Sequence, residues 1–271
     1  MPLLPGAEPY RRAGGPVGVL LVHGFTGSPQ SVRPWAEHLA DAGLTVSVPL
    51  LPGHGTRWQD LQHTRWEDWY ATVETAFAEL AADCERVFVC ALSMGGSLAL
   101  RLAAQHGDRV SGLVLVNPSV RSDNPATVLL PLLRHLLPSL PGVAGDIALP
   151  GAAEVGYDRV PLHAAWSLAR LWEATQAGMP SVTQPVLLMH SPQDHVVSPR
   201  NSALVLARIS STDVTELLLD RSFHVATLDH DAGRIFDASL DFVRRLAPAA
   251  AVDAGNHSGS TRPDPEAGAR G

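Results

Sequence analysis

The chain has 271 residues, of which 45% are hydrophobic and 17% charged, a globular composition with ample material for a core. All 20 positively charged side chains are Arg. The absence of Lys excludes phosphate-loop hydrolases, protein kinases and enzymes that form a Schiff base with their substrate. The formal net charge of −7 argues against a protein that binds nucleic acid.

Neither a secretory signal nor a membrane span is expected. Residues 1–15 lack a charged start followed by a long apolar core, and no apolar run approaches the roughly 20 residues of a span. Cys84 and Cys90 are too few for a disulfide framework and are expected to be small buried hydrophobes. We therefore expect a cytoplasmic enzyme, and its 12 His are the first candidates for proton transfer.

Short apolar runs alternate with longer helical stretches as far as residue 246. The predicted strands span residues 16–22, 44–48, 86–92, 110–116, 185–190 and 214–219. The predicted helices span residues 31–42, 66–82, 94–106, 199–209 and 234–246. Near-continuous apolar strands separated by helices are typical of a parallel sheet covered on both faces. The pattern predicts a single doubly wound α/β domain in residues 1–246.

Two stretches interrupt this alternation. Residues 117–184 are too many for a simple crossover, and apolar helical patterns at 128–137 and 164–175 predict a small helical cap inserted there. A further crossover helix with long loops is the alternative. Residues 247–271 are rich in Ala, Gly, Pro and Ser without periodicity, which predicts a disordered tail.

The segment around Ser93 has the pattern of a nucleophile elbow. Ser93 lies between a predicted strand and a predicted helix, where a sharp turn would raise its hydroxyl above the sheet. Small residues two positions before and after, Ala91 and Gly95, let the backbone pack closely, although Gly is more usual at the first position. A simple helix cap is the alternative role of Ser93.

A serine nucleophile needs two N–H donors for the oxyanion that forms during acyl transfer. The first is expected from the backbone of Met94, directly after the serine. The second is expected from Phe25, in a loop that Gly24 and Gly27 allow to curl toward the site. The side chain of His23 is interpreted as structural, forming a hydrogen bond with this loop.

In this architecture the acid and then the histidine follow the serine along the chain. Asp194 is the carboxylate in the loop after the fifth predicted strand, and Asp220 is its rival. His224 follows the sixth predicted strand, and His230 is its rival. A carboxylate in this position orients the imidazole and stabilises its cation.

These segments together resemble the bacterial monoacylglycerol lipases and related carboxylesterases of the α/β-hydrolase fold. The resemblance covers about residues 18–246 and rests on LVHGFTGSP (21–29), LPGHGT (51–56), WEDW (66–69), LSMGG (92–96), DHVV (194–197) and SFHVATLDHD (222–231). It implies Ser93, Asp194 and His224 as the catalytic triad, with Phe25 and Met94 as oxyanion donors, in agreement with the interpretation from the residues. It also implies a cap that shapes an acyl pocket, in which Glu154 would contact the glycerol head.

The expected reaction is two-step hydrolysis of a carboxylic ester through an acyl-enzyme, without cofactor or metal. The expected substrate is a small acyl ester such as a monoacylglycerol. Esters of other alcohols, thioesters and carbon–carbon bonds are alternatives, because only the pocket would differ. A dehalogenase or epoxide hydrolase would use an Asp nucleophile where this chain has Ser93. A non-catalytic binder that kept the fold is the remaining alternative, and the sequence does not predict the oligomeric state.

Overall fold

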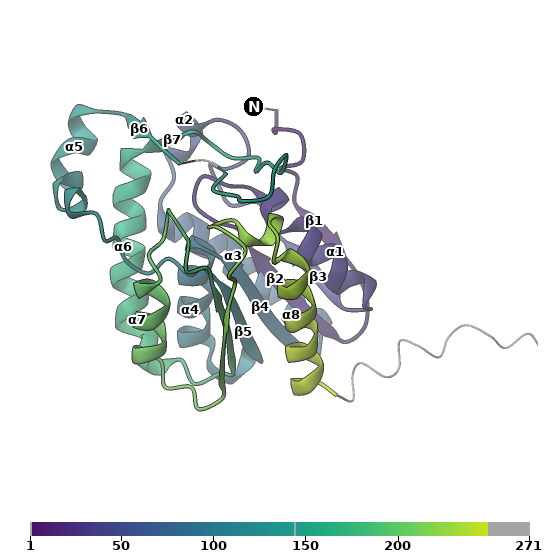
Figure 1. The fold of residues 1–271 in the computed structure, drawn as a ribbon. Coiled ribbons are helices and arrows are strands. Elements are labelled where there is room, and N and C mark those ends of the chain that lie inside the picture. Colours follow the sequence, from purple (N-terminus) through teal and green to yellow (C-terminus); the bar gives the residue numbers. More distant parts are fainter. Residues whose placement is uncertain (1, 144, 249–271) are drawn as a thin grey trace, which may run out of the picture.

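The computed structural model describes residues 2–143 and 145–248. The tail predicted for 247–271 therefore lies outside the described residues except for Ala247 and Pro248. A seven-stranded sheet forms the centre of the molecule, with the strand order β1-β3-β2-β4-β5-β8-β9 (Figure 1). Its strands are β1 (Tyr10–Arg12), β2 (Val17–Val22), β3 (Thr45–Val48), β4 (Arg86–Leu92), β5 (Gly112–Val116), β8 (Val186–His190) and β9 (Val214–Leu218).

Six of these strands are parallel, and the short β1 pairs antiparallel with β3 at one edge. The prediction of a mostly parallel, doubly wound sheet is confirmed, and the six predicted strands agree with the observed ones to within two residues. Strand β1 was not predicted. It has three residues, none of them fully buried, so it carries no apolar periodicity.

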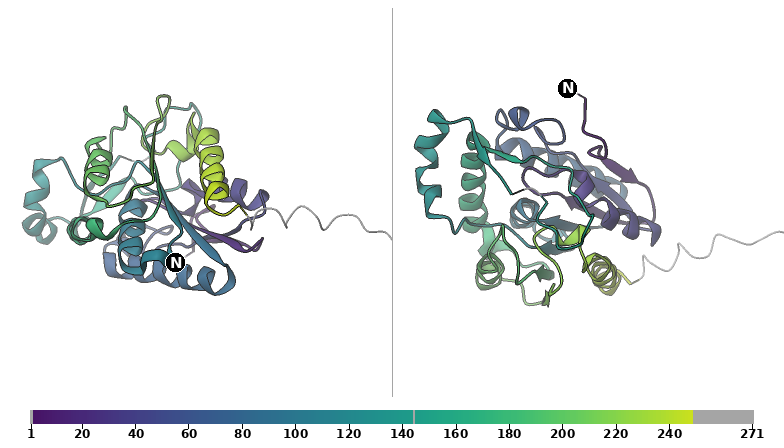
Figure 2. Two further views of the ribbon diagram at one scale, coloured as in Figure 1. Left: turned by 90° about the horizontal axis from the view of Figure 1, so that it is seen from below. Right: turned by 45° about the horizontal axis from the view of Figure 1, so that its top comes forward.

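Helices cover both faces of the sheet (Figure 2). The helices of the domain are α1 (Arg33–Asp41), α2 (Trp58–Leu61), α3 (Trp66–Asp83), α4 (Met94–His106), α5 (Leu130–Leu136), α6 (Leu162–Gly178), α7 (Arg200–Arg208) and α8 (Ala232–Leu246). Short 3₁₀ turns occupy Pro29–Ser31, Gly107–Arg109, Pro125–Leu129, Met179–Ser181 and Ala226–Leu228.

Each face of the sheet has its own apolar core, because successive strand side chains point to opposite faces. In β4, Val89 and Ala91 pack with α3 and α4, whereas Phe88 and Cys90 pack with α1 and α8. This two-sided burial explains why the central strands read as continuous apolar runs. It also makes β4 a firm support for the turn that follows it.

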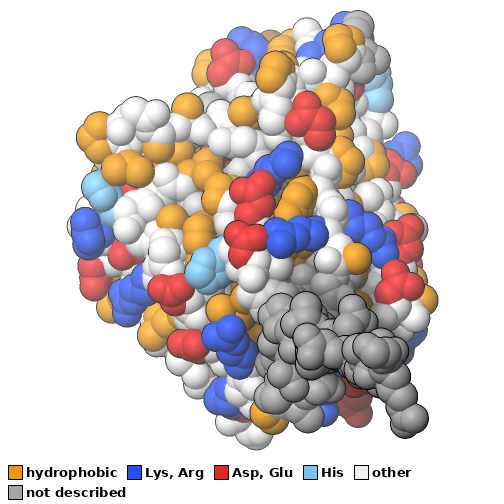
Figure 3. Space-filling view, turned by 90° about the vertical axis from the view of Figure 1, so that its right-hand side faces the viewer, with side chains coloured by type: hydrophobic (Ala, Val, Ile, Leu, Met, Phe, Trp, Pro, Cys, Tyr) orange, Lys and Arg blue, Asp and Glu red, His pale blue; other side chains and the backbone are white. Residues whose placement is uncertain are grey.

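The described part of the face on the side of α1 and α8 carries basic and acidic side chains among hydrophobic and uncharged ones (Figure 3). Basic and acidic side chains alternate there, and ion pairs such as Arg12–Asp41 and Arg33–Glu37 join some of them. No helix in the described part of the chain is long and apolar enough to cross a membrane.

The stretch 117–184, predicted as a cap insertion, contains two kinds of structure. Helix α6 lies in the helical layer beside α4, where Thr175 donates a hydrogen bond to the backbone of Ser97. Helix α5 and the antiparallel pair β6 (Ser139–Pro141) and β7 (Arg159–Pro161) lie at the top of Figure 1, above the carboxyl ends of the strands. The loop between β6 and β7 crosses the same end of the sheet.

Candidate active site

Ser93 occupies the sharp turn between β4 and α4, as the sequence predicts. Its backbone has φ 55° and ψ −120°, a conformation that is strained for a residue with a side chain and costs on the order of 1–3 kcal/mol. Gly95 permits this turn, since a Cβ atom there would lie 2.3 Å from the carbonyl oxygen of Val22. The serine is therefore held in a strained position by close backbone packing.

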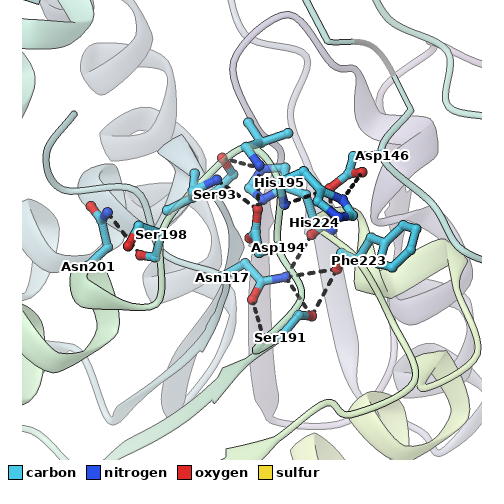
Figure 4. A network of polar contacts seen from close by, with 12 residues as sticks. Ser93, Asn117, Asp146, Ser191, Asp194, His195, Ser198, Asn201, Phe223 and His224 are labelled. Carbon is cyan, nitrogen blue, oxygen red and sulfur yellow. Dashed lines mark hydrogen bonds and ion pairs between the residues drawn. The ribbon is translucent and has the colours of Figure 1, made fainter. Parts of the chain in front are cut away.

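The structure brings Ser93, His224 and Asp194 into one hydrogen-bonded chain (Figure 4). The Ser93 Oγ atom lies 2.9 Å from His224 Nε2, and His224 Nδ1 lies 2.7 Å from Asp194 Oδ2. Because a carboxylate can only accept, Nδ1 carries the proton and Nε2 is free to accept the serine hydroxyl. Ser93 is 8% exposed and the Asp194 side chain 1%, so water contributes little to this arrangement.

The second oxygen of Asp194 is fixed as well. Asp194 Oδ1 accepts hydrogen bonds from the backbone N–H groups of Val196 and Val197, at 2.8 and 2.7 Å. The two rival residues lie elsewhere: Asp220 and His230 are both exposed. Within the described residues, neither side chain forms a hydrogen bond with Ser93, Asp194 or His224.

Asn117, which the sequence analysis missed, joins the two loops that carry the acid and the histidine. It follows β5 with φ 45°, and its amide nitrogen donates to the carbonyl oxygens of Phe223 and His224 at 3.3 and 2.8 Å. Its Oδ1 accepts the backbone N–H of Ser191 at 2.7 Å. The available signal was an Asn directly after a buried parallel strand, a place where polar side chains often serve a site.

The predicted oxyanion loop lies against the serine. A Cβ atom added to Gly24 would be 3.3 Å from Ser93 Cβ, a tight contact, so the glycine lets this backbone lie close to the nucleophile. Phe25 and Met94 line the same cavity as Ser93. The backbones predicted to supply the two N–H donors are therefore both beside the nucleophile.

The His23 side chain supports this loop, as predicted. Its Nε2 accepts the backbone N–H of Leu51 at 3.2 Å, so Nδ1 carries the proton and donates to the carbonyl oxygen of Gly24 at 2.9 Å. Burial lowers the pKa of His23 to about 4. The imidazole is therefore neutral near neutral pH and acts as a structural bridge.

Ser93 and His224 open into a cavity of about 650 Å³. Apolar side chains from α5, from β6, β7 and the residues beside them, and from α6 form much of its wall. They are Leu130, Leu133, Leu140, Val143, Val160, Leu162, Leu168 and Trp172. This volume lies within the usual range for small-molecule sites, which combine apolar walls with a few convergent polar groups. A second cavity of about 690 Å³ shares none of these lining residues.

Glu154 lines the same cavity and lies beside the oxyanion loop. A Cβ atom added to Gly27 would be 2.7 Å from Glu154 Oε1. Burial raises the pKa of Glu154, while the neighbouring His224 and the backbone of Gly145 act in the opposite direction. Glu154 therefore lies on the cavity wall close to Gly27 of the oxyanion loop.

Within the described residues, no group of three or more His, Cys, Asp or Glu side chains is arranged to hold a metal ion. A serine in a strained strand-to-helix turn, with an oriented histidine above a parallel sheet, defines a serine hydrolase of the α/β-hydrolase fold.

Comparison with known proteins gives the same class. The family model described as serine aminopeptidase, S33 matches residues 17–231, and the chain belongs to this family. A thermostable monoacylglycerol lipase from Bacillus sp. (strain H-257) is 43% identical over 247 residues, which cover 91% of this chain and 98% of that protein.

Solved structures agree with this assignment. A structure from work on the metagenome-derived lipolytic enzymes LipS and LipT is 39% identical and covers 90% of this chain and 100% of its own, with a TM-score of 0.88. The monoacylglycerol lipase of Paleococcus ferrophilus has a TM-score of 0.73 over 88% of this chain and 99% of its own. At 21% identity, the second structure supports the fold alone.

Proposed function

We propose that this protein is a monoacylglycerol lipase that releases a fatty acid and glycerol through an acyl-enzyme on Ser93. The observation that carries the proposal is the chain of hydrogen bonds from Asp194 through His224 to Ser93, at the floor of an apolar-walled cavity. The 43% identity to a protein named thermostable monoacylglycerol lipase supports this substrate class.

The reaction begins when His224 Nε2 takes the proton of Ser93 Oγ and the oxygen bonds to the ester carbonyl carbon. Asp194 holds the imidazole in the required tautomer and stabilises its positive charge. The bond to the glycerol oxygen then breaks, and Nε2 returns the proton to that oxygen. Water attacks the acyl-enzyme by the same route, which frees the fatty acid and restores Ser93.

The carbonyl oxygen becomes negative in both steps. In the proposal, the backbone N–H groups of Phe25 and Met94 donate hydrogen bonds to it. Donors of this kind are worth about 3 kcal/mol each, because they are oriented before charge develops. The location of both residues on the cavity wall beside Ser93 supports this role.

The two ends of the substrate require different surroundings. We assign the acyl chain to the apolar wall that includes Leu133, Leu168 and Trp172. We assign the glycerol head to Glu154, whose carboxyl group can accept a hydrogen bond from a hydroxyl. In this proposal the cap predicted for residues 117–184 covers the cavity with α5, β6, β7 and the segment 145–158. We also propose that the enzyme acts in the cytoplasm.

A general carboxylesterase or thioesterase is the second candidate. A carboxylesterase of Bacillus subtilis (strain 168) is 23% identical over 242 residues, covering 88% of this chain and 97% of that protein. The Ser93 chemistry would be the same, so the pocket decides between them.

A hydrolysis panel tests the proposal. Monoacylglycerols, diacylglycerols, acyl thioesters and simple esters of matched chain length are compared, with Ser93→Ala as the inactive control. We expect the highest kcat/KM for monoacylglycerols and a fluorophosphonate adduct on Ser93. A higher kcat/KM for simple esters or thioesters would support the second candidate, and the absence of an adduct would exclude a serine enzyme.

A further inference from the structure

Asp146 lies in the loop between β6 and β7 and contacts both loops that carry the acid and the base. Its Oδ2 accepts the backbone N–H of His224 and that of His195, each at 3.1 Å. Its Oδ1 lies 2.9 Å from His195 Nδ1, and its carbonyl oxygen accepts the N–H of Val225 at 3.0 Å. The carboxylate, whose side chain is 10% exposed, thus holds the residue after Asp194 and the histidine itself (Figure 4).

A second carboxylate, on the histidine loop, binds the backbone of the β6–β7 loop in return. Asp229, in the segment after His224, accepts the backbone N–H groups of Ala148 and Leu149 at 2.7 and 2.9 Å. It also accepts the N–H of Phe223 at 2.9 Å. Asp229 of the histidine loop therefore binds the backbone of the β6–β7 loop, and Asp146 of the β6–β7 loop binds the backbone of the histidine loop.

The other end of this loop is attached to the oxyanion loop. The Ser28 hydroxyl donates to the carbonyl oxygen of Val155 at 2.7 Å, and Gln30 Oε1 accepts the N–H of Val155 at 2.9 Å. The N–H of Tyr157 donates to the carbonyl oxygen of Thr26 at 2.9 Å. Residues 145–157, which we call the strap, therefore connect the histidine loop to the oxyanion loop across the cavity.

We propose that Asp146 is a positioning residue, through which the strap sets the orientation of His224 relative to Ser93. The Ser93–His224 distance depends on the His224 backbone, and a charged acceptor on that N–H resists its displacement. A displacement of about 1 Å at a reacting group can lower the rate about 100-fold. The proposal rests on the proposed function only in taking Ser93 as the reacting group.

Charge and hydrogen bonding contribute separately at this residue. The imidazole of His224 becomes a cation during the reaction, and a nearby carboxylate stabilises that cation. The other ionisable groups of this region are Asp194 and His195 of the acid loop, Glu154 of the strap and Asp229 of the histidine loop, and Arg121 and Asp123 line the same cavity. Asp146→Asn keeps an oxygen acceptor and removes the charge, whereas Asp146→Ala removes both.

The experiment compares Asp146→Ala and Asp146→Asn with the wild type and with Asp158→Ala, an exposed acid of the same loop. The kcat and KM for a short, soluble p-nitrophenyl ester are measured with the rate of fluorophosphonate labelling of Ser93 and the melting temperature. We expect Asp146→Ala to lower kcat and the labelling rate about 10- to 100-fold, with KM changed less than about twofold. Asp158→Ala should match the wild type.

Asp146→Asn should recover most of the kcat, and the acidic limb of its pH profile for kcat/KM should move to lower pH. A merely structural residue would lower the folded fraction without moving this limb. A folded Asp146→Ala variant with the kcat and labelling rate of the wild type would overturn the proposal. If that variant does not fold, the proposal would be overturned by an Asp146→Asn variant whose acidic limb for kcat/KM lies at the same pH as that of the wild type. Since labelling does not require a monoacylglycerol, failure of the proposed substrate leaves this result readable.

Discussion

The sheet and the region above it use apolar residues in opposite ways. In β2, β4 and β5 nearly every residue is buried, because helices cover both faces of the sheet. In α5 no residue is fully buried, and Leu132 and Leu136 are 62% and 67% exposed. The neighbouring Leu130 and Leu133 of the same helix line the cavity. The sheet therefore buries the core of the fold, whereas α5 contributes to the wall of the cavity.

The two regions also differ in how they are held. The sheet is joined by ladders of backbone hydrogen bonds, which buried apolar cores protect on both sides. The strap is held by side-chain carboxylates, a hydroxyl and an amide that bind backbone groups of other loops. Substitutions in the sheet loops and at their anchors should therefore lower the rate of the chemistry, and substitutions on the cavity side of α5 should change selectivity.

The largest effect is expected at the acid. Asp194→Asn should lower kcat roughly 10³- to 10⁴-fold, because the amide cannot hold His224 in the required tautomer. Steady-state kinetics with a p-nitrophenyl ester measure the change. The matched variant Asp220→Asn should retain wild-type activity, and the reverse ranking would move the acid to Asp220.

A smaller loss is expected at Asn117. Asn117→Ala should lower kcat about 10- to 100-fold, because both functional loops lose a shared anchor. It should also lower the free energy of unfolding by about 2–3 kcal/mol, because buried backbone groups lose their partners. Chemical denaturation and kinetics measure the two effects. Asn124→Ala removes an exposed hydrogen bond to the N–H of Ala126 and serves as the control: it should lower the free energy of unfolding by only about 1 kcal/mol and should not lower kcat 10-fold.

In the cap region the expected effect is on selectivity. Leu133→Ser should lower kcat/KM for a long-chain ester roughly 5- to 20-fold, because the acyl chain loses an apolar contact. The short-chain ester should be nearly unaffected. Leu132→Ser, one residue away on the exposed side of α5, serves as the control. Equal losses in both variants would place the acyl chain elsewhere.

The smallest expected effect is on stability, namely on how the free energy of unfolding changes with pH. Burial lowers the pKa of His23 to about 4 and that of His54 to about 3, so the unfolded chain binds their protons first as the pH falls below about 6.5. Each histidine contributes stability that is complete above about pH 6.5 and is lost as the pH falls toward about 4 for His23 and about 3 for His54, at about 1.4 kcal/mol per pH unit.

Denaturation between pH 6.5 and 5 measures this slope. His23→Gln should reduce it by about half, because one of the two buried imidazoles no longer titrates. His230→Gln, at an exposed position, should leave the slope unchanged. An unchanged slope in His23→Gln would mean that His23 does not contribute to it.

Local patterns predicted the parts of the site that lie on the ends of strands. Ser93, Asp194 and His224 each follow a strand that apolar periodicity alone identifies, and the structure brings them within hydrogen-bonding distance. Asn117 has the weaker signal of an Asn directly after the buried strand β5, whereas Asp146 and Asp229 follow no such strand. Their partners are backbone N–H and C=O groups in distant loops, and any residue type supplies those groups.

The sequence by itself determined the chemistry that this protein lacks and the class to which it belongs. The absence of Lys excludes several reaction classes, and the order of Ser, Asp and His after predicted strands indicates a hydrolase. Only the tertiary structure decided how those residues are held and what covers them. Strand periodicity is a local property of the chain. The contacts of the strap join residues up to 127 positions apart, so they exist only once the sheet has formed.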